Sequence, residues 1–213
     1  NEKHSFNFAY SRRITRPTFN DMAPFVIFVD PNTFFSGNPS LQPSISDEVK
    51  ADYLFKNVVL SVQYTYEADP ITNFSPSVDP ESNKQTLAAE NQKSRKTFNV
   101  ILSLPIKVNS WWSMQNNFTG TAQTLDGTYK GDPILLKQKS LNARTTQTFS
   151  LPKEFSLELS GFFKSPGMIS VYKVNSFGSL DFGAQKKFPK IRSSLRLAYD
   201  NILNTLIFKP DIK

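Results

Sequence analysis

Residues 154–165 read EFSLELSGFFKS, with an apolar residue or glycine at every second position from Phe155 to Phe163. Ser156 and Glu158 stand between them. Because successive side chains of a strand point to opposite faces, this alternation predicts a β-strand with one apolar and one polar face. The same period of two recurs at residues 49–55, 58–66 and 98–106, and more weakly at 6–10 and 195–199.

The period predicts nine strands, at residues 2–13, 45–55, 58–67, 88–105, 110–122, 136–151, 154–165, 174–188 and 191–203. Between them, short turns at 56–57, 105–109, 152–153 and 189–190 alternate with long connections at 14–44, 68–87, 123–135 and 166–173. Only Thr86–Lys93 has helical character, and we interpret it as loop and strand start. In an antiparallel meander, alternate connections lie on opposite rims, so the short turns share one rim and the long loops the other.

Long strands with this arrangement of connections are typical of transmembrane barrels. The longest apolar run is Phe25–Val29, whereas a spanning helix needs about 20 apolar residues. A barrel needs no such run, because only half of each strand faces lipid, and a hydrophobic content of 38% fits that pattern. We therefore expect an all-β fold: a segment of an antiparallel up-and-down transmembrane β-barrel.

The composition argues against catalysis and against cofactors. There is no cysteine, which excludes disulfides and thiolate chemistry, and His4 is the single histidine. No Gly-x-Ser-x-Gly turn, phosphate loop or zinc spacing is present. The adjacent acids Asp47 and Glu48 would point to opposite faces of a strand and could not share a substrate. We expect no enzyme, no metal site and no cofactor.

A net charge of +7 raises the question of a nucleic-acid partner. The basic residues, however, are dispersed among short turns and long loops, and no nucleic-acid-binding motif is present. Dispersed charge on the rims of a β-protein suits contact with anionic lipid better than binding to a duplex. We expect outer-membrane lipid, and no nucleic acid, among the partners.

Aromatic residues gather near the short turns. They are Trp111, Trp112, Phe55, Phe149, Phe155 and Phe188. Aromatic rings at one rim are typical of the girdle that a barrel places at the membrane interface. The alternative for each residue taken alone is an anchor at a hairpin end, as in any β-protein.

The first long connection carries a recognisable run. Residues 10–17 read YSRRITRP, and Phe25 and Gly37-Asn38-Pro39 follow. This run resembles the C-terminal barrel of TonB-dependent outer-membrane receptors, in the outer-membrane protein β-barrel family common in Bacteroidetes; the DNILNT stretch at 200–205 is a weaker match. We interpret the motif residues as structural, with ligand contact as the alternative. They are Arg12, Arg13, Arg16, Pro17, Phe25, Gly37, Asn38 and Pro39.

The resemblance implies a function and a location. Such receptors lie in the bacterial outer membrane, capture substrate with extracellular loops and pass it through the lumen, driven by the TonB complex acting on a plug domain. Since their barrels have about 22 strands, residues 1–213 are expected to be a partial barrel without the plug. Implied partners are the TonB complex, through the plug region, and a surface lipoprotein or other outer-membrane subunit. The alternatives are a structural or interaction barrel in a larger outer-membrane assembly, or a soluble β-rich binding domain.

Overall fold

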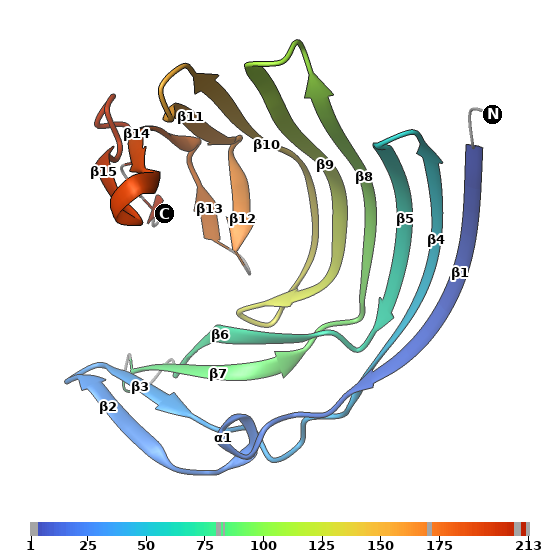
Figure 1. The fold of residues 1–213 in the computed structure, drawn as a ribbon. Coiled ribbons are helices and arrows are strands. Elements are labelled where there is room, and N and C mark those ends of the chain that lie inside the picture. Colours follow the sequence, from blue (N-terminus) through green and yellow to red (C-terminus); the bar gives the residue numbers. More distant parts are fainter. Residues whose placement is uncertain (1–3, 80–81, 83, 170–171, 207–209, 212–213) are drawn as a thin grey trace.

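The computed structural model describes residues 4–79, 82, 84–169, 172–206 and 210–211. Its main feature is one curved nine-stranded antiparallel sheet (Figure 1). In spatial order the strands are β1 (His4–Thr15), β4 (Ser44–Phe55), β5 (Val58–Ala68), β8 (Ser94–Lys107), β9 (Trp112–Tyr129), β10 (Asp132–Leu151), β11 (Phe155–Lys164), β14 (Phe177–Phe188) and β15 (Ser193–Tyr199). Each of the nine expected strands has its counterpart here. In the described part of the chain β1 and β15 do not pair, so the sheet is open.

The two faces of the main sheet differ in chemistry along its whole width. Cross-strand register joins Tyr53, Leu60, Leu102, Phe118, Ala143 and Phe163 in one row on one face. The adjacent row on the other face joins Asp52, Ser61, Ile101, Thr119, Asn142 and Lys164. The period of two in the sequence is therefore in phase from strand to strand, which produces one apolar and one mainly polar face.

The strands are staggered, as they must be in a barrel. The β4–β5 hairpin ends at the pair Phe55–Val58, and the same row falls at Leu104 on β8. The β8–β9 hairpin extends three residues further towards the short-turn rim, to Lys107. The β10–β11 hairpin again ends beyond the β8–β9 end. Such a progressive offset is the geometric result of strands that tilt relative to a barrel axis.

One expected long connection is a continuous hairpin. Residues 123–135 were expected to form a loop, but β9 and β10 pair as far as Tyr129 and Asp132, and Lys130 and Gly131 form the turn with φ of 54° and 88°. The expectation was wrong because Gly127 and Pro133 read as loop residues. In the structure Gly127 makes room for a packed side chain, and Pro133 lies at the hairpin end, where a missing N–H costs little.

The other long connections contain structure that was not expected. Residues 14–44 and 68–87 contribute helix α1 (Phe19–Met22) and strands β2 (Val26–Asp30), β3 (Thr33–Ser36) and β6 (Ile71–Val78). Of residues 86–93, interpreted as loop and strand start, 86–91 belong to β7 (Gln85–Asn91), and 92–93 connect it to β8. These strands form a second sheet in the order β2-β3-β7-β6, which Figure 1 shows at the end of the main sheet opposite its short turns. In this sheet β3, from the first long connection, pairs in parallel with β7, which follows the second. A pairing between segments so far apart could not be predicted from alternation in the sequence.

Several boundaries also differ from those expected. The short turn placed at 105–109 lies at 108–111, because Pro105 still pairs with Gln115. Residues 189–191 form a 3-10 helix, η1 (Pro189–Ile191), and β15 ends at 199 instead of 203. A third small sheet contains β12 (Gly167–Ile169), β13 (Tyr172–Val174) and β16 (Pro210–Asp211). Among the described residues, no helix has the length and apolarity to cross a membrane.

Candidate functional site

The polar face of the main sheet lies on its concave side. The β12–β13 hairpin is on the inner side of the curve in Figure 1, and a cavity of about 180 Å³ beside it is lined by Gly167 and Val174. The opposite wall of this cavity is formed by polar residues of β9 and β10, among them Gln123, Gln138 and Asn142. The face that carries these side chains is therefore the inner one, as expected for a water-filled lumen.

Two pairs of oppositely charged side chains lie on the concave face. Arg95 Nη1 lies 2.9 Å from Glu67 Oε2, and the two side chains are 27% and 21% exposed. Lys50 Nζ lies 3.1 Å from Asp52 Oδ2, and Ser61 donates a hydrogen bond to the other oxygen of that carboxylate. Each pair joins groups on one face, and the partial burial makes such contacts stronger than exposed pairs.

Uncharged polar side chains extend the same network across the sheet. Gln63 Nε2 donates to Glu48 Oε2 at 2.6 Å, and Thr121 Oγ1 donates to Asn99 Oδ1 at 2.8 Å. Gln123 Nε2 donates to Thr97 Oγ1 at 3.3 Å. Much of the inner wall is thus a surface of donors and acceptors. Such a wall can exchange hydrogen bonds with water and with a polar solute.

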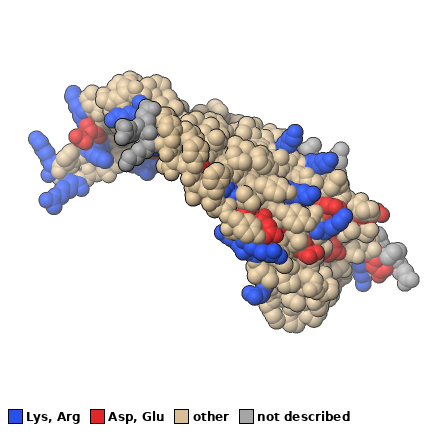
Figure 2. All heavy atoms as spheres, turned by 90° about the vertical axis from the view of Figure 1, so that its right-hand side faces the viewer, with Lys and Arg blue, Asp and Glu red and all other residues tan. Residues whose placement is uncertain are grey.

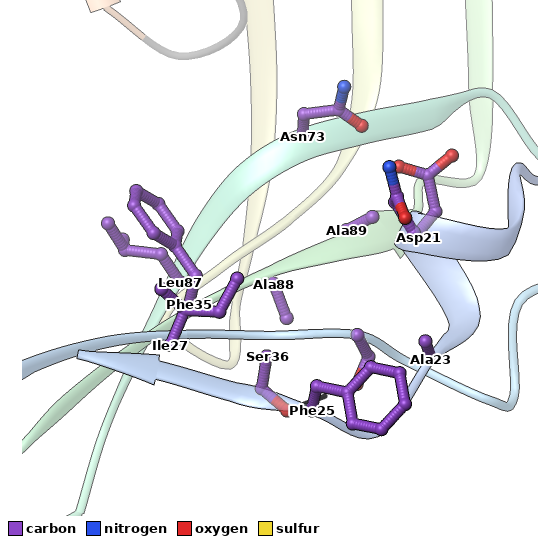
Figure 3. A pocket seen from close by; sticks show the side chains of 12 residues that line it. Asp21, Ala23, Phe25, Ile27, Phe35, Ser36, Asn73, Leu87, Ala88 and Ala89 are labelled. Carbon is purple, nitrogen blue, oxygen red and sulfur yellow. Dashed lines mark hydrogen bonds between the residues drawn. The ribbon is translucent and has the colours of Figure 1, made fainter. Parts of the chain in front are cut away.

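A pocket lies in the second sheet, at the long-loop rim (Figure 3). It has a volume of about 220 Å³, and Ala23, Phe25, Ile27, Phe35 and Leu87 contribute apolar walls. Asp21 and Asn73 add polar groups, and Figure 3 shows them on the side of the pocket away from Phe35 and Leu87. The pocket has the mixture of apolar walls and few polar groups that is typical of small-ligand sites.

Helix α1 is fixed by its cap. Thr18 and Asp21 form a capping box, in which each side chain bonds the backbone of the other residue. Across the strand turn, Asp30 accepts a hydrogen bond from the backbone N–H of Asn32 at 2.8 Å. That backbone hydrogen bond, followed by one from the Thr33 side chain, lowers the pKa of the Asp30 carboxyl below its ordinary value.

The structure brings some of the family-motif residues together around this pocket. Phe25 and Gly37 line it, and a Cβ on Gly37 would lie 2.0 Å from the Ala23 carbonyl oxygen, so only glycine fits there. Asn38 donates its backbone N–H to Asp21 O at 2.7 Å and its side-chain amide to Ala89 O at 3.0 Å. These contacts hold the second sheet to α1 and support the structural interpretation of the motif.

The other motif residues lie apart from the pocket lining. Arg12 is on the convex face of β1, 3.8 Å from Asp47, and Arg13 is on the opposite face of the same strand. Arg16 and Pro17 follow β1, and Pro39 is an exposed residue after Asn38. Ligand contact by any of these residues remains a prediction.

The aromatic residues expected to form a girdle lie at the short-turn rim in separate groups. Trp111, Trp112 and Phe149 form one cluster, with ring centroids 5.8 to 6.3 Å apart. Phe155 and Phe188 lie on either side of Lys186, whose ammonium is 4.1 Å from the centre of the Phe155 ring. Phe55 stacks on His4 at 4.6 Å. Their role at a membrane interface remains a prediction.

Sequence reasoning did not identify the concave ion pairs. Glu67 and Arg95 are 28 residues apart in sequence, and only the strand register brings them face to face. A usable signal was present for Lys50 and Asp52, which have opposite charge at positions two apart on one strand face. Among the described residues, no group of three or more histidine and acidic side chains could hold a metal ion.

The sheet geometry agrees with comparisons to known proteins. The model of the outer membrane protein beta-barrel family matches residues 1–213. A solved structure, the siderophore receptor PirA from Pseudomonas aeruginosa, superposes with a TM-score of 0.66 at 14% identity, over 95% of this chain and 36% of that one. The chain thus spans about a third of that receptor, and the likeness concerns the fold. No curated protein matches the chain.

The chain therefore belongs to the outer membrane protein beta-barrel family, and its location is the bacterial outer membrane. Its curved, open nine-stranded sheet has the fold of part of the barrel of a TonB-dependent receptor. This membership argues against the alternative of a soluble β-rich binding domain.

Proposed function

We propose that residues 1–213 form part of the barrel of a TonB-dependent receptor, of the type common in Bacteroidetes. In this role the chain lines a substrate pathway and performs no covalent chemistry. The observation that carries the proposal is the mainly polar, hydrogen-bonded inner wall of β4, β5, β8 and β9, opposite an apolar outer face. A wall of that kind suits passage of a polar solute, which meets donors and acceptors all along its path.

Ligand capture is assigned to the long-loop rim. The second sheet stands there on the same end of the main sheet as the β9–β10 turn (Figure 1), and its pocket is held rigidly by α1 and Asn38. A pre-formed pocket at the entrance of a polar channel lowers the ordering cost of binding. The likeness to a siderophore receptor supports uptake in general, and siderophores, glycans and peptides are all candidate substrates.

The proposal is tested by binding of the full-length protein, in detergent, to the periplasmic domain of TonB. A receptor should bind that domain, and removal of its plug region should abolish binding, because the plug region carries the contact. Absence of binding by the full-length protein would contradict the proposal. It would favour the other candidate, a structural barrel associated with a surface lipoprotein or another outer-membrane subunit.

A further inference from the structure

Three lysines mark the long-loop end of the convex face. Strand register places Lys96 beside Thr124, and Thr124 beside Lys137, so the two lysines are two strands apart, about 10 Å. Lys139 follows Lys137 on the same face, about 7 Å along β10. All three side chains are exposed. Below them the same face is apolar, with Phe98 and Leu141 next in line.

These lysines have no counterion in the protein. None of the three forms an ion pair with a described residue, in contrast to Lys50 and Arg95 on the concave face. Two carboxylates lie towards the long-loop end of the same face, and both are engaged elsewhere. Asp126 is 3.1 Å from Lys93, and Asp47 accepts a hydrogen bond from Tyr10 at 2.6 Å. The positive charge of the three lysines is therefore uncompensated at the edge of an apolar surface.

A groove runs from these lysines into the apolar band. Its volume is about 450 Å³, and its lining includes Phe98, Val100, Gly120, Ala122, Lys139 and Leu141. Gly120 forms part of the floor, and a Cβ there would meet nothing within 4 Å, so the depression exists because this position has no side chain. The lining is mainly apolar, with Thr121, Ser140 and Ser165 as its uncharged polar members, and Lys139 is the one of the three lysines that lines the groove.

We propose that this groove and the three lysines bind a phosphorylated lipid of the outer leaflet. One acyl chain lies in the groove over Gly120, and the phosphate is held by Lys139 together with Lys137 and Lys96. The chemistry of the two parts matches an amphiphile with an anionic head, since an apolar groove alone would take any lipid chain. The long-loop end of such barrels faces outward, which assigns the lipid to the outer leaflet. The inference rests on the membrane location and is independent of substrate uptake.

The test uses the full-length protein in a nonionic detergent, titrated with lipid A and followed by native mass spectrometry. Lipid A carries phosphates and acyl chains, and its dephosphorylated form is the first comparison. We expect Lys137→Gln/Lys139→Gln to weaken binding of the phosphorylated form on the order of 30-fold, since each lysine near a membrane contributes a factor of about five. Gly120→Leu, which fills the groove, should weaken binding about tenfold, as when about two CH₂ groups lose an apolar contact.

Two matched variants serve as controls. Lys186→Gln removes a convex lysine at the short-turn rim, and Ala184→Leu adds nearly as much bulk to the convex face, two strands beyond the groove. Both should bind lipid A as the unmodified protein does. The proposal is overturned if dephosphorylated lipid A binds equally well, if the groove and lysine variants stay within twofold of the unmodified protein, or if the controls lose as much affinity.

Discussion

On the concave face of the main sheet, Arg95 and Lys50 each lie within about 3 Å of a carboxylate, whereas Lys96 and Lys137 on the convex face have no acidic partner among the described residues. Arg95 and Lys96 are neighbours in sequence, so one step along β8 separates the two conditions. Figure 2 shows a related division at the surface: charged side chains gather towards two ends of the molecule, with uncharged surface between them.

The difference follows from what each face meets. A charge on the inner wall is partly shielded from bulk water by the curved sheet, so a protein counterion reduces its desolvation cost. On the outer face, charge is excluded from the hydrocarbon and is found where headgroups or water can solvate it. The chemistry of a side chain on this sheet therefore depends both on the face that carries it and on its distance from the middle of the membrane.

Replacement of an apolar residue in the middle of the convex face should have the largest effect. Leu102 lies between Leu60 and Phe118 in cross-strand register. We expect Leu102→Arg to destabilise the folded barrel by about 2–4 kcal/mol, because its charge would face hydrocarbon. Urea unfolding of the full-length protein in phospholipid vesicles measures the change. Ser103→Arg, one residue away on the concave face, should cost less than about 1 kcal/mol; equal costs would show that the faces are assigned wrongly.

The concave ion pair should give the next largest effect. Arg95→Gln leaves the partly buried Glu67 carboxylate with its bond from Ser44 alone, and we expect a loss of about 1–2 kcal/mol, between the values for exposed and buried pairs. A double-mutant cycle with Glu67→Gln measures the coupling. The matched change Lys96→Gln should alter stability in detergent by less than about 0.5 kcal/mol. A cost at Lys96 as large as that at Arg95 would remove the contrast between the faces.

Two glycines of β9 extend the comparison to packing. A Cβ on Gly127 would lie 1.8 Å from Gln92 Oε1, and that oxygen accepts the backbone N–H of Thr128 at 2.6 Å. Gly127→Ala should displace Gln92, cost about 1 kcal/mol and increase hydrogen exchange of the Thr128 amide. Gly120→Ala on the convex face should be neutral or slightly stabilising, by up to about 1 kcal/mol. Faster hydrogen exchange of the Thr128 amide in both variants would mean that the space around each glycine does not explain the difference between them.

The girdle prediction can be tested without mutation of the girdle residues. Trp111 and Trp112 are the only tryptophans of the chain. In the full-length protein folded into vesicles, with any tryptophan outside these residues replaced by phenylalanine, lipids with a nitroxide near the headgroup should quench the fluorescence of Trp111 and Trp112 more than lipids with a nitroxide at the chain end, because indole rings prefer the interface. Stronger quenching from the bilayer centre would contradict the girdle.

The main sheet could be predicted from sequence because its signal is local. In 155–163 and 98–106 the alternation alone marks strand and face. Each strand of the main sheet has a predicted counterpart, although the predicted strand 88–105 also includes the end of β7, which belongs to the second sheet. Which face of the sheet points inward could not be predicted, since the alternation is identical for an inward and an outward apolar face. The curvature of the sheet and the position of the β12–β13 hairpin show that the polar face is the inner one.

The second sheet and the concave ion pairs could not be predicted, because both depend on residues distant in sequence. Strand β3 meets β7 about 50 residues later and in parallel, and Glu67 meets Arg95 through strand register. The family motif gave part of the rim site: Phe25 and Gly37 line the pocket, and Asn38 braces it. Gly37 is the motif residue with the clearest physical requirement, since any side chain there would collide with Ala23.

The β9–β10 hairpin has a consequence for what the cell presents to its surroundings. Strand β10 has 20 residues, about 65 Å of extended chain, and even at a 45° tilt it rises about 45 Å, well beyond an apolar band of about 25 Å. The turn at Lys130 and Gly131 therefore stands clear of the bilayer. For a protease, an antibody or a labelling reagent approaching an intact bacterium, this turn is within reach, and an epitope inserted there would report folding and orientation in living cells.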